Sequence, residues 1–443
     1  MKYLNSVFAL ALYLVSFNCC AQSDNSVKEY IQQNAVALDT NYNSDDFKDL
    51  LKIKQTLQGR RIIALGEATH GTHDFQAIKF RIFRFLVTNM GYKLFGIEAN
   101  FAACRVVNNY ILNGQGDAKQ AISGLRFWTW RTTDVLQMVE WMRQYNAGKP
   151  MDQKVQFFGF DMQLERYSIM QLADKLKKLD SVYFKDHFAL VLTMEIYDDD
   201  KNVFTKYSKN EIDSIKTLLV NIGNYVNANK TTLAKLYSTD EIAFTERDIV
   251  LLEQCLEEGM AANNDKVSTV SQNEVRDKYM AENVQWILDH EGPDSKMMLW
   301  AHNRHIDKHG GGFSNLGTHL KTGYNDQYYA IGFDFNKGSF NAFEPKSSTI
   351  KVFTVSNSRE GSSGDFFSRT GLPVFFIDIE KAVKTNSDLE KFFTKNIYHR
   401  EVGGGYDPAT DENKSYFNEP LYKLYNGLIF VDKTTATTLF KKQ

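Results

Sequence analysis

The chain has 443 residues, with 52 basic and 54 acidic side chains and a formal net charge of −2. A chain of this length exceeds one ordinary hydrophobic core, so two structural units are expected. Because affinity for nucleic acid rests on Lys and Arg side chains that neutralise phosphates, the balanced charge argues against a nucleic-acid partner. The hydrophobic content of 43% and the charged content of 24% are ordinary for a soluble globular protein.

The N-terminal segment has the pattern of an export signal. Residues 7–17 (VFALALYLVSF) are apolar, follow a lysine near the start and precede small residues that end at Ala21. The apolar run is too short to cross a bilayer comfortably, which favours a cleaved signal peptide over residues 1–21 against an uncleaved anchor. Cys19 and Cys20 lack a good lipidation motif before them, so a lipoprotein is disfavoured. We expect export to the periplasm or the cell exterior, with no stable membrane span after cleavage.

Two cysteines, Cys104 and Cys255, remain after this cleavage. They are too few for a disulfide framework, and the chain has no C-x-x-C pair of the kind that holds a metal. We expect two buried thiols, while the sequence leaves open whether they pair.

Strands and helices alternate in the first part of the mature chain. The expected elements are a short helix over 27–38, strands over 61–66, 92–97 and 155–160, and amphipathic helices over 75–90 and 133–145. Gly91 stands where the first amphipathic helix should end, and Thr132, Thr133 or Asp134 could cap the second. This alternation predicts a parallel sheet with helices on its faces.

From residue 165 to residue 290 the strand pattern disappears. Apolar residues recur at helical spacing over 167–179, 210–229, 245–263 and 274–290. Strand patterns return over 296–300, 328–334, 349–355, 373–377 and 427–432. The predicted fold is α/β, with a mostly parallel central sheet, flanking helices and a helical-bundle insertion. The α/β domain would comprise residues 22–164 and 291–443, and the insertion or cap residues 165–290.

Four of the expected strands end in side chains that can do chemistry. The residues that follow them are Glu67 and His70, Glu98, Asp161, and His302 and His305. Ligands bind outside the carboxyl ends of parallel strands, so these residues would form one site if the strands are neighbours. Carboxylates and imidazoles together are typical of a hydrolytic site or a metal site.

Several of these residues have more than one interpretation. His70 could be a general base oriented by Glu67, or an exposed loop histidine beside a capping carboxylate. Glu98 is costly to bury without a partner, which could be a histidine, a metal or a salt-bridge cation such as Arg105 or Lys79. The spacing of His302 and His305 matches no known zinc signature, so a metal site and a metal-free acid–base network both remain open.

Other features carry less information. His73 is one turn beyond His70 and peripheral to it, and Asp74 could cap the next helix. Trp128 and Trp130 could form an apolar substrate wall or belong to the core. No G-x-S-x-G motif occurs, which disfavours a standard serine hydrolase.

Several blocks of the sequence resemble the erythromycin esterase family. The more specific ones are GEATHGTHDF (66–75) and LWAHNRHI (299–306). GIEAN (96–100), FFGFDMQ (157–163), RDKYMAENVQWIL (276–288) and YYAIGFDFNKGSF (328–340) agree in the same order. The resemblance covers roughly residue 51 to the C-terminus. Two positions depart from the family pattern: Lys79 stands where Arg is frequent, and Asp134 where Glu is frequent.

The resemblance implies an α/β enzyme with a deep cleft that hydrolyses esters or lactones. His70 would activate water, Glu67 and Glu98 would orient it or carry protons, and His302 or His305 would stabilise the oxyanion or protonate the leaving alkoxide. The candidate substrate-binding residues are Trp128, Trp130, Asp161, Lys79 and His73. No cofactor is required by this scheme, and a divalent metal is left open.

Two classes of function follow. The favoured one is an exported carboxylic ester hydrolase acting on a small-molecule ester or lactone, with macrolide ring opening as one candidate activity. The alternative is a non-catalytic protein that binds a metal, haem or glycan in the same cleft. Acyl transfer during polysaccharide assembly is a third idea. The sequence does not determine the oligomeric state.

Overall fold

The computed structural model describes residues 24–192, 194, 197–198, 201–202, 207–264 and 271–441. The predicted signal peptide lies outside these ranges. The chain divides into two compact units. Unit 1 runs up to Gly91 and includes Ala301–Gly312 and Lys321–Thr438; unit 2 comprises Tyr92–Trp300, Phe313–Leu320 and the end of the chain from Leu439. These bounds differ from the predicted domains because strands on both sides of the predicted insertion cluster with its helices.

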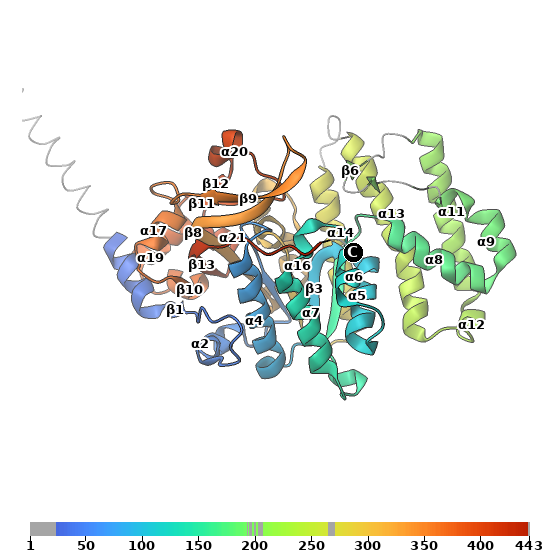
Figure 1. Cartoon of the computed structure of the whole chain (residues 1–443), viewed down its shortest axis with the longest axis horizontal. Helices are drawn as coiled ribbons and strands as arrows, with labels where there is room; N and C mark the ends of the chain where they lie inside the picture. The colour runs from blue at the N-terminus through green and yellow to red at the C-terminus, as the bar shows by residue number, and fades with distance from the viewer. Residues whose placement is uncertain are drawn as a thin grey trace, which may run out of the picture. The chain divides into compact units, whose positions relative to one another are not determined.

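Unit 1 contains a mixed set of strands in the order β1-β10-β13-β8-β2, with β9 paired to β8 (Figure 1). The pairs β13–β8 and β8–β2 are parallel, whereas β1–β10, β10–β13 and β8–β9 are antiparallel. The bounds are β1 (Val36–Ala37), β2 (Ile62–Leu65), β8 (Tyr328–Glu344), β9 (Thr349–Val355), β10 (Val374–Asp378) and β13 (Gly427–Thr434). All four side chains of β2 are buried, as expected of a strand with parallel neighbours and both faces covered.

The helices of unit 1 confirm the predicted helix before Gly91. α4 (His73–Met90) ends at this glycine, whose φ of 72° is the left-handed conformation that favours Gly. The predicted helix over 27–38 is wrong at its C-terminal end. The observed helix covers 24–34, because β1 then pairs with Phe375 and Phe376 of β10. The other elements are α2 (Lys48–Leu51), α3 (Lys54–Leu57), α15 (Asn303–Ile306), α17 (Ser363–Ser368), α18 (Ile379–Val383), α19 (Ser387–Thr394), β11 (Ile397–Arg400), α20 (Pro408–Lys414), β12 (Tyr416–Glu419) and α21 (Leu421–Leu424).

Unit 2 contains three parallel strands in the order β7-β3-β4. Their bounds are β3 (Leu94–Asn100), β4 (Gln156–Asp161) and β7 (Met297–Trp300). β3 is followed directly by α5 (Phe101–Asn113), which the sequence analysis did not predict, and then by α6 (Ala118–Ser123). α7 (Thr133–Asn146) agrees with the predicted helix, and Thr132 is its cap because its hydroxyl accepts the Val135 N–H.

The predicted helical segment of unit 2 is confirmed. α13 (Thr239–Asn264) packs against α8 (Arg166–Leu179), α11 (Lys209–Ala228) and α14 (Gln272–His290). α11 and α14 each begin with a capping box, made by Ser208 with Glu211 and by Ser271 with Glu274. The short elements are α9 (Ser181–His187), α10 (Ala189–Leu192), α12 (Lys230–Leu233) and the strand pair β5 (Tyr197–Asp198) and β6 (Lys201–Asn202). α16 (Leu316–Tyr324) begins in unit 2 and ends in unit 1.

Cys104 and Cys255 are free, buried thiols, as expected. Burial raises the pKa of both thiols well above the usual value, so neither carries a reactive thiolate. Among the described helices, none has an apolar stretch long enough to cross a membrane.

Candidate active site

Glu67 and His70 form a close pair in the turn that follows β2. The fully buried Glu67 accepts a hydrogen bond from His70 Nδ1 at 2.7 Å through Oε1. Its other oxygen, Oε2, accepts one from Lys79 Nζ of α4 at 2.6 Å. Burial alone would raise the pKa of the Glu67 carboxyl, but the Lys79 charge and the bond to His70 lower it below its usual value. Glu67 is therefore an ionised carboxylate held between two donors.

This pairing defines the chemistry of the His70 ring. With the Nδ1 proton directed at Glu67, the neutral imidazole carries its basic lone pair on Nε2. The His70 side chain keeps 14% of its surface exposed, so solvent reaches it. A carboxylate that orients a histidine and stabilises its protonated form is the arrangement found in general-base catalysis.

Lys79 is fully buried, and its ammonium lies against Glu67 and over the ring of Phe333. This burial favours a positioning role over the substrate-binding role predicted for it. His73 is the first residue of α4, and its ring lies edge-on to Tyr42 at 6.1 Å. Asp74 does not cap the helix, as the sequence had suggested it could. It is buried and accepts hydrogen bonds from Thr435 and from the Tyr42 hydroxyl.

The turn that carries His302 and His305 is tied to the Glu67 turn. The backbone N–H of Asn303 donates to the Glu67 carbonyl at 3.0 Å. The Asn303 side chain pairs with both backbone groups of Phe333 in β8 and lies against Gly66, where any Cβ would collide with it. The rings of His70 and His302 are 5.0 Å apart. Asn303 was not among the predicted site residues, although it belongs to the HNRH motif.

His302 binds backbone groups through both ring nitrogens. Nδ1 accepts the Arg304 N–H at 3.3 Å, which makes His302 the cap of α15. Nε2 lies 3.2 Å from the Val402 carbonyl, to which it can donate. His305 is partly exposed one turn further on. Within this turn, His305 is therefore the better candidate for direct contact with a substrate.

Glu98 and Asp161 share one cation in unit 2. Arg276 of α14 contacts Glu98 at 3.0 Å and Asp161 at 2.6 Å. Burial alone would lower the pKa of the Arg276 guanidinium, but the charges of Asp161 and Glu98 raise it well above its usual value. Of the cations suggested for Glu98, Arg105 binds Asp248 and Lys79 binds Glu67, whereas Arg276 was not among the suggestions.

The two predicted aromatic residues lie in the short 3₁₀ turn η1 (Trp128–Trp130) of unit 2. Trp130 is buried and meets Trp300 edge-on at 6.1 Å, as a core residue does. Trp128 is half-buried. Asp161 is fully buried, and its contact with Arg276 suits a structural role better than substrate binding. The predicted roles of these three residues toward a substrate stay predictions.

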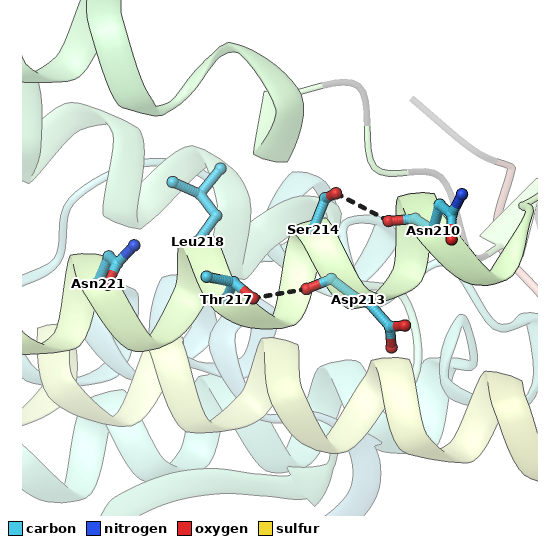
Figure 2. A pocket seen from close by; sticks show the side chains of 6 residues that line it. All are labelled: Asn210, Asp213, Ser214, Thr217, Leu218 and Asn221. Carbon is cyan, nitrogen blue, oxygen red and sulfur yellow. Dashed lines mark hydrogen bonds between the residues drawn. The ribbon is translucent and has the colours of Figure 1, made fainter.

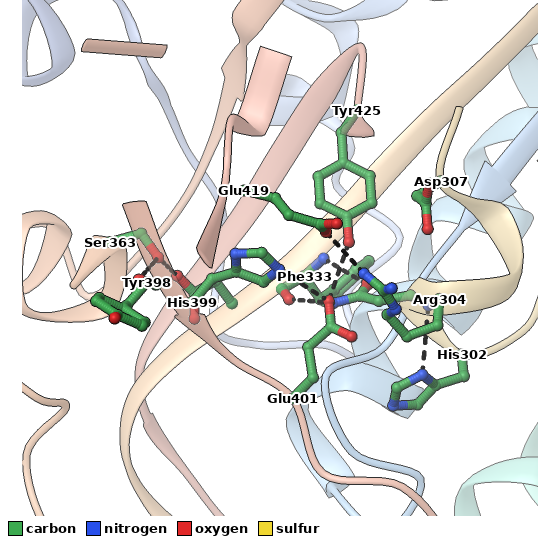
Figure 3. Close-up of polar contacts among 12 residues, drawn as sticks. His302, Arg304, Asp307, Phe333, Ser363, Tyr398, His399, Glu401, Glu419 and Tyr425 are labelled. Carbon is green, nitrogen blue, oxygen red and sulfur yellow. Dashed lines mark hydrogen bonds and ion pairs between the residues drawn. The ribbon is translucent and has the colours of Figure 1, made fainter. Parts of the chain in front are cut away.

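A buried polar cluster of unit 1 was not predicted as part of a site (Figure 3). Its centre is Glu401, which contacts His399 and Tyr425 and lies close to Asn303. Burial alone would raise the pKa of Glu401, but the hydrogen bond and charge of His399, together with the positive charge of Arg304, hold it at about 2. Gly403–Gly405 follow Glu401 closely in a glycine-rich stretch. The one available signal was the run of charged residues just before it, His399 to Glu401.

Asp307, near this cluster, yields a stability prediction. Burial raises its pKa to about 6, and Oδ2 has no hydrogen-bond partner among the described residues. A carboxyl group whose pKa is raised in the folded state stabilises the fold at pH values below its pKa in the unfolded chain. This stabilisation is lost as the pH rises from about 4 through about 6. Asp307→Asn should therefore gain about 2 kcal/mol relative to wild type between pH 4 and pH 7.5 in urea unfolding. Oδ1 could still accept the N–H groups of His309 and Gly310.

The control is Asp326→Asn, because Asp326 has a 96% exposed side chain. It should change the unfolding free energy by less than about 0.5 kcal/mol at either pH. A difference in unfolding free energy between Asp307→Asn and wild type that is the same at pH 4 and at pH 7.5 would contradict the prediction.

Two hollows in unit 2 contain none of the predicted catalytic residues. One, of about 530 Å³, is lined by polar residues of α11, including Asp213 and Thr217 (Figure 2). The other, of about 910 Å³, lies among α5, α8, α13 and the end of α14. Among the described residues, no group of three or more His, Cys, Asp or Glu side chains is arranged to hold a metal ion.

A carboxylate–histidine pair can serve a hydrolytic enzyme, and it is the sequence comparison that defines the class of protein. The family model described as erythromycin esterase matches residues 87–434. The chain is 25% identical to the putative hydrolase YbfO of Bacillus subtilis (strain 168), over 98% of this chain and 97% of that protein. It is 24% identical to erythromycin esterase type II of Escherichia coli, over 89% and 99%.

Solved structures agree on the fold. A Bacillus cereus protein covers 94% of this chain and 99% of its own at 22% identity, with a TM-score of 0.81. A mutant of erythromycin esterase EreC in its open conformation covers 89% and 96% at 18% identity, with a TM-score of 0.66. The chain belongs to the erythromycin esterase family and is a hydrolase, and the predicted α/β fold is confirmed.

Proposed function

We propose that the protein is an exported hydrolase of carboxylic esters or lactones in which His70 activates water. One observation carries this proposal: the buried Glu67 carboxylate accepts the Nδ1 hydrogen bond of His70 and is locked in place by Lys79. Such a pair sets the histidine tautomer and stabilises the imidazolium that forms when the base takes a proton.

In the proposed reaction, Nε2 of His70 removes a proton from water as the water oxygen attacks the carbonyl carbon. The C–O bond to the alkoxide then breaks, and the alkoxide takes up a proton, so one water is consumed for each acid and alcohol formed. We assign protonation of the alkoxide to His305 rather than His302, because both ring nitrogens of His302 bind backbone groups. The role of Glu98 in orienting water or carrying a proton stays a prediction from the sequence, and within unit 2 its cation is Arg276.

Substrate class and location rest on different observations. The named relatives from Escherichia coli make macrolide lactones a candidate substrate. Export rests on the apolar segment near the N-terminus. No covalent enzyme intermediate is needed, because a histidine base can deliver water directly to the carbonyl carbon.

The test is a panel of simple esters, lactones and erythromycin, incubated with the protein beginning at Gln22 in ¹⁸O-labelled water. Mass spectrometry should show one ¹⁸O in the product carboxylate, also in a single turnover with enzyme in excess. An unlabelled carboxylate in the first turnover would mean that an enzyme carboxylate attacks the substrate. Absence of turnover on every member would contradict hydrolysis and favour a binding protein.

A further inference from the structure

We propose that Glu401 and His399 are positioning residues that hold the His302 turn beside the catalytic base and set the protonation of the His302 ring. The His302 ring would act on the reaction through the base, because it lies 5.0 Å from the His70 ring. This inference rests on the proposed hydrolysis, because it assigns a role in that reaction to a buried cluster behind the site. Neither residue touches the place where a substrate would meet His70. Both would act through the turn that carries His302.

The segment that contains Glu401 connects the two turns of the candidate site. The Val402 N–H donates to the Ala68 carbonyl at 2.6 Å, next to Glu67. The Val402 carbonyl lies 3.2 Å from His302 Nε2. Residues 401 and 402 therefore bind the Glu67 turn on one side and the His302 turn on the other.

The Glu401 carboxylate is nearly surrounded by protein, with a side chain that is 1% exposed. Its Oε1 lies 3.4 Å from His399 Nε2 and 3.2 Å from the Tyr425 hydroxyl, which donates to it (Figure 3). Asn303 Nδ2 is 3.5 Å from the same oxygen. Oε2 is buried and has no hydrogen-bond partner within the described ranges. Burying a carboxylate oxygen without a hydrogen bond destabilises the fold, because the lost hydration is not replaced. This cost points to a role for the charge of Glu401.

The charges around Glu401 come from several elements. Burial alone would lower the pKa of His399, but the carboxyl groups of Glu401 and Asp334 raise it. Arg304 contributes positive charge to Glu401 and is itself bound to Glu419 at 2.8 Å.

Asp307 adds negative charge near Glu401. The His302 ring interacts electrostatically with Glu401, accepts the backbone N–H of Arg304 and lies beside the His70 ring. Glu401 is thus the buried anion that compensates the positive turn next to the catalytic base.

Substitutions of Glu401 and His399 should shift the pKa of His302 in opposite directions. Glu401→Gln removes a negative charge near His302 and should lower the pKa of His302 by about one unit. His399→Gln removes a positive charge from the far side of Glu401 and should raise the pKa of His302. A cluster that only stabilises the fold would not move one histidine in opposite directions.

The readout is the pH titration of the His302 ring signal in histidine-labelled protein by NMR, assigned with a His302→Asn variant. Glu419→Gln is the matched control, because it removes another carboxylate near Arg304, and it should shift the His302 pKa by less than about 0.3 units. Equal or same-direction shifts in the Glu401 and His399 variants would overturn the inference.

Enzyme activity is the second measurement. On an ester that wild type hydrolyses, Glu401→Gln should lower kcat/KM by about tenfold or more and shift the pH profile, while Glu419→Gln stays within about threefold. Unchanged kcat/KM and pH profile in folded Glu401→Gln would overturn the role in catalysis. If wild type hydrolyses nothing, the proposed function fails, and the opposite NMR shifts alone then report the coupling of Glu401 to His302.

Discussion

Replacing His70 with Ala should reduce ester or lactone hydrolysis by about a thousandfold, with little change in KM. The substitution removes the nitrogen that takes the proton from water and leaves the Glu67–Lys79 pair intact. The rate should be measured on the best substrate of the panel by product mass spectrometry, across pH 5 to 9. The acidic limb of the pH profile, where protonation of His70 removes the base, should disappear from the residual activity.

His73→Ala is the matched control for this experiment. His73 is three residues further along, at the start of α4, and contacts Tyr42 rather than Glu67. Its loss should change kcat/KM by less than about tenfold. The thermal unfolding midpoints of both variants should be compared with wild type. A His70→Ala enzyme that keeps most of its activity while folded would refute His70 as the base.

Replacing Arg276 with Met should destabilise the protein by about 3–5 kcal/mol. The guanidinium is the shared partner of Glu98 and Asp161, and the Asp161 side chain is fully buried. Methionine fills similar space but leaves two carboxylates without their cation, and removal of one partner from a buried ion pair costs more than the pair contributes. Urea unfolding at pH 7 measures this loss.

Lys278→Met provides the control within the same helix. Lys278 is two residues away in α14, and its ion pair with Glu282 is about half exposed, at 3.8 Å. The change should cost less than about 1 kcal/mol. Adding Asp161→Asn to Arg276→Met should recover part of the lost stability, because it removes one uncompensated charge. Equal effects of Arg276→Met and Lys278→Met would contradict the importance of this cluster.

Local patterns in the sequence predicted much of the secondary structure. The apolar run before Glu67 predicts β2, and the helical spacing before Gly91 predicts α4, because both signals lie within one element. The contact of Glu67 with His70 was also predictable, because the two residues are three positions apart in one turn. The order of the family motifs was also readable from the sequence.

The sequence could not reveal which charge each carboxylate meets. Glu98 pairs with Arg276, which is 178 residues away, and both suggested nearby cations are bound elsewhere. Such pairs depend on which helix packs against which strand, and local propensity carries no information on this. Lys79 illustrates the same limit: its position in a helix was predictable, but its burial against Glu67 was not.

By itself, the sequence predicted the α/β alternation, the helical segment of unit 2 and the candidate acid–base residues at the strand ends, because each depends on a few consecutive residues. Only the tertiary structure decided that Val402 joins the turns of Glu67 and His302 and that Glu401 is buried behind them. Residues 401 and 402 come about a hundred positions after His302 in a glycine-rich stretch without a periodic pattern. Their role arises from backbone hydrogen bonds and charge compensation between distant segments, which exist only once the chain has folded.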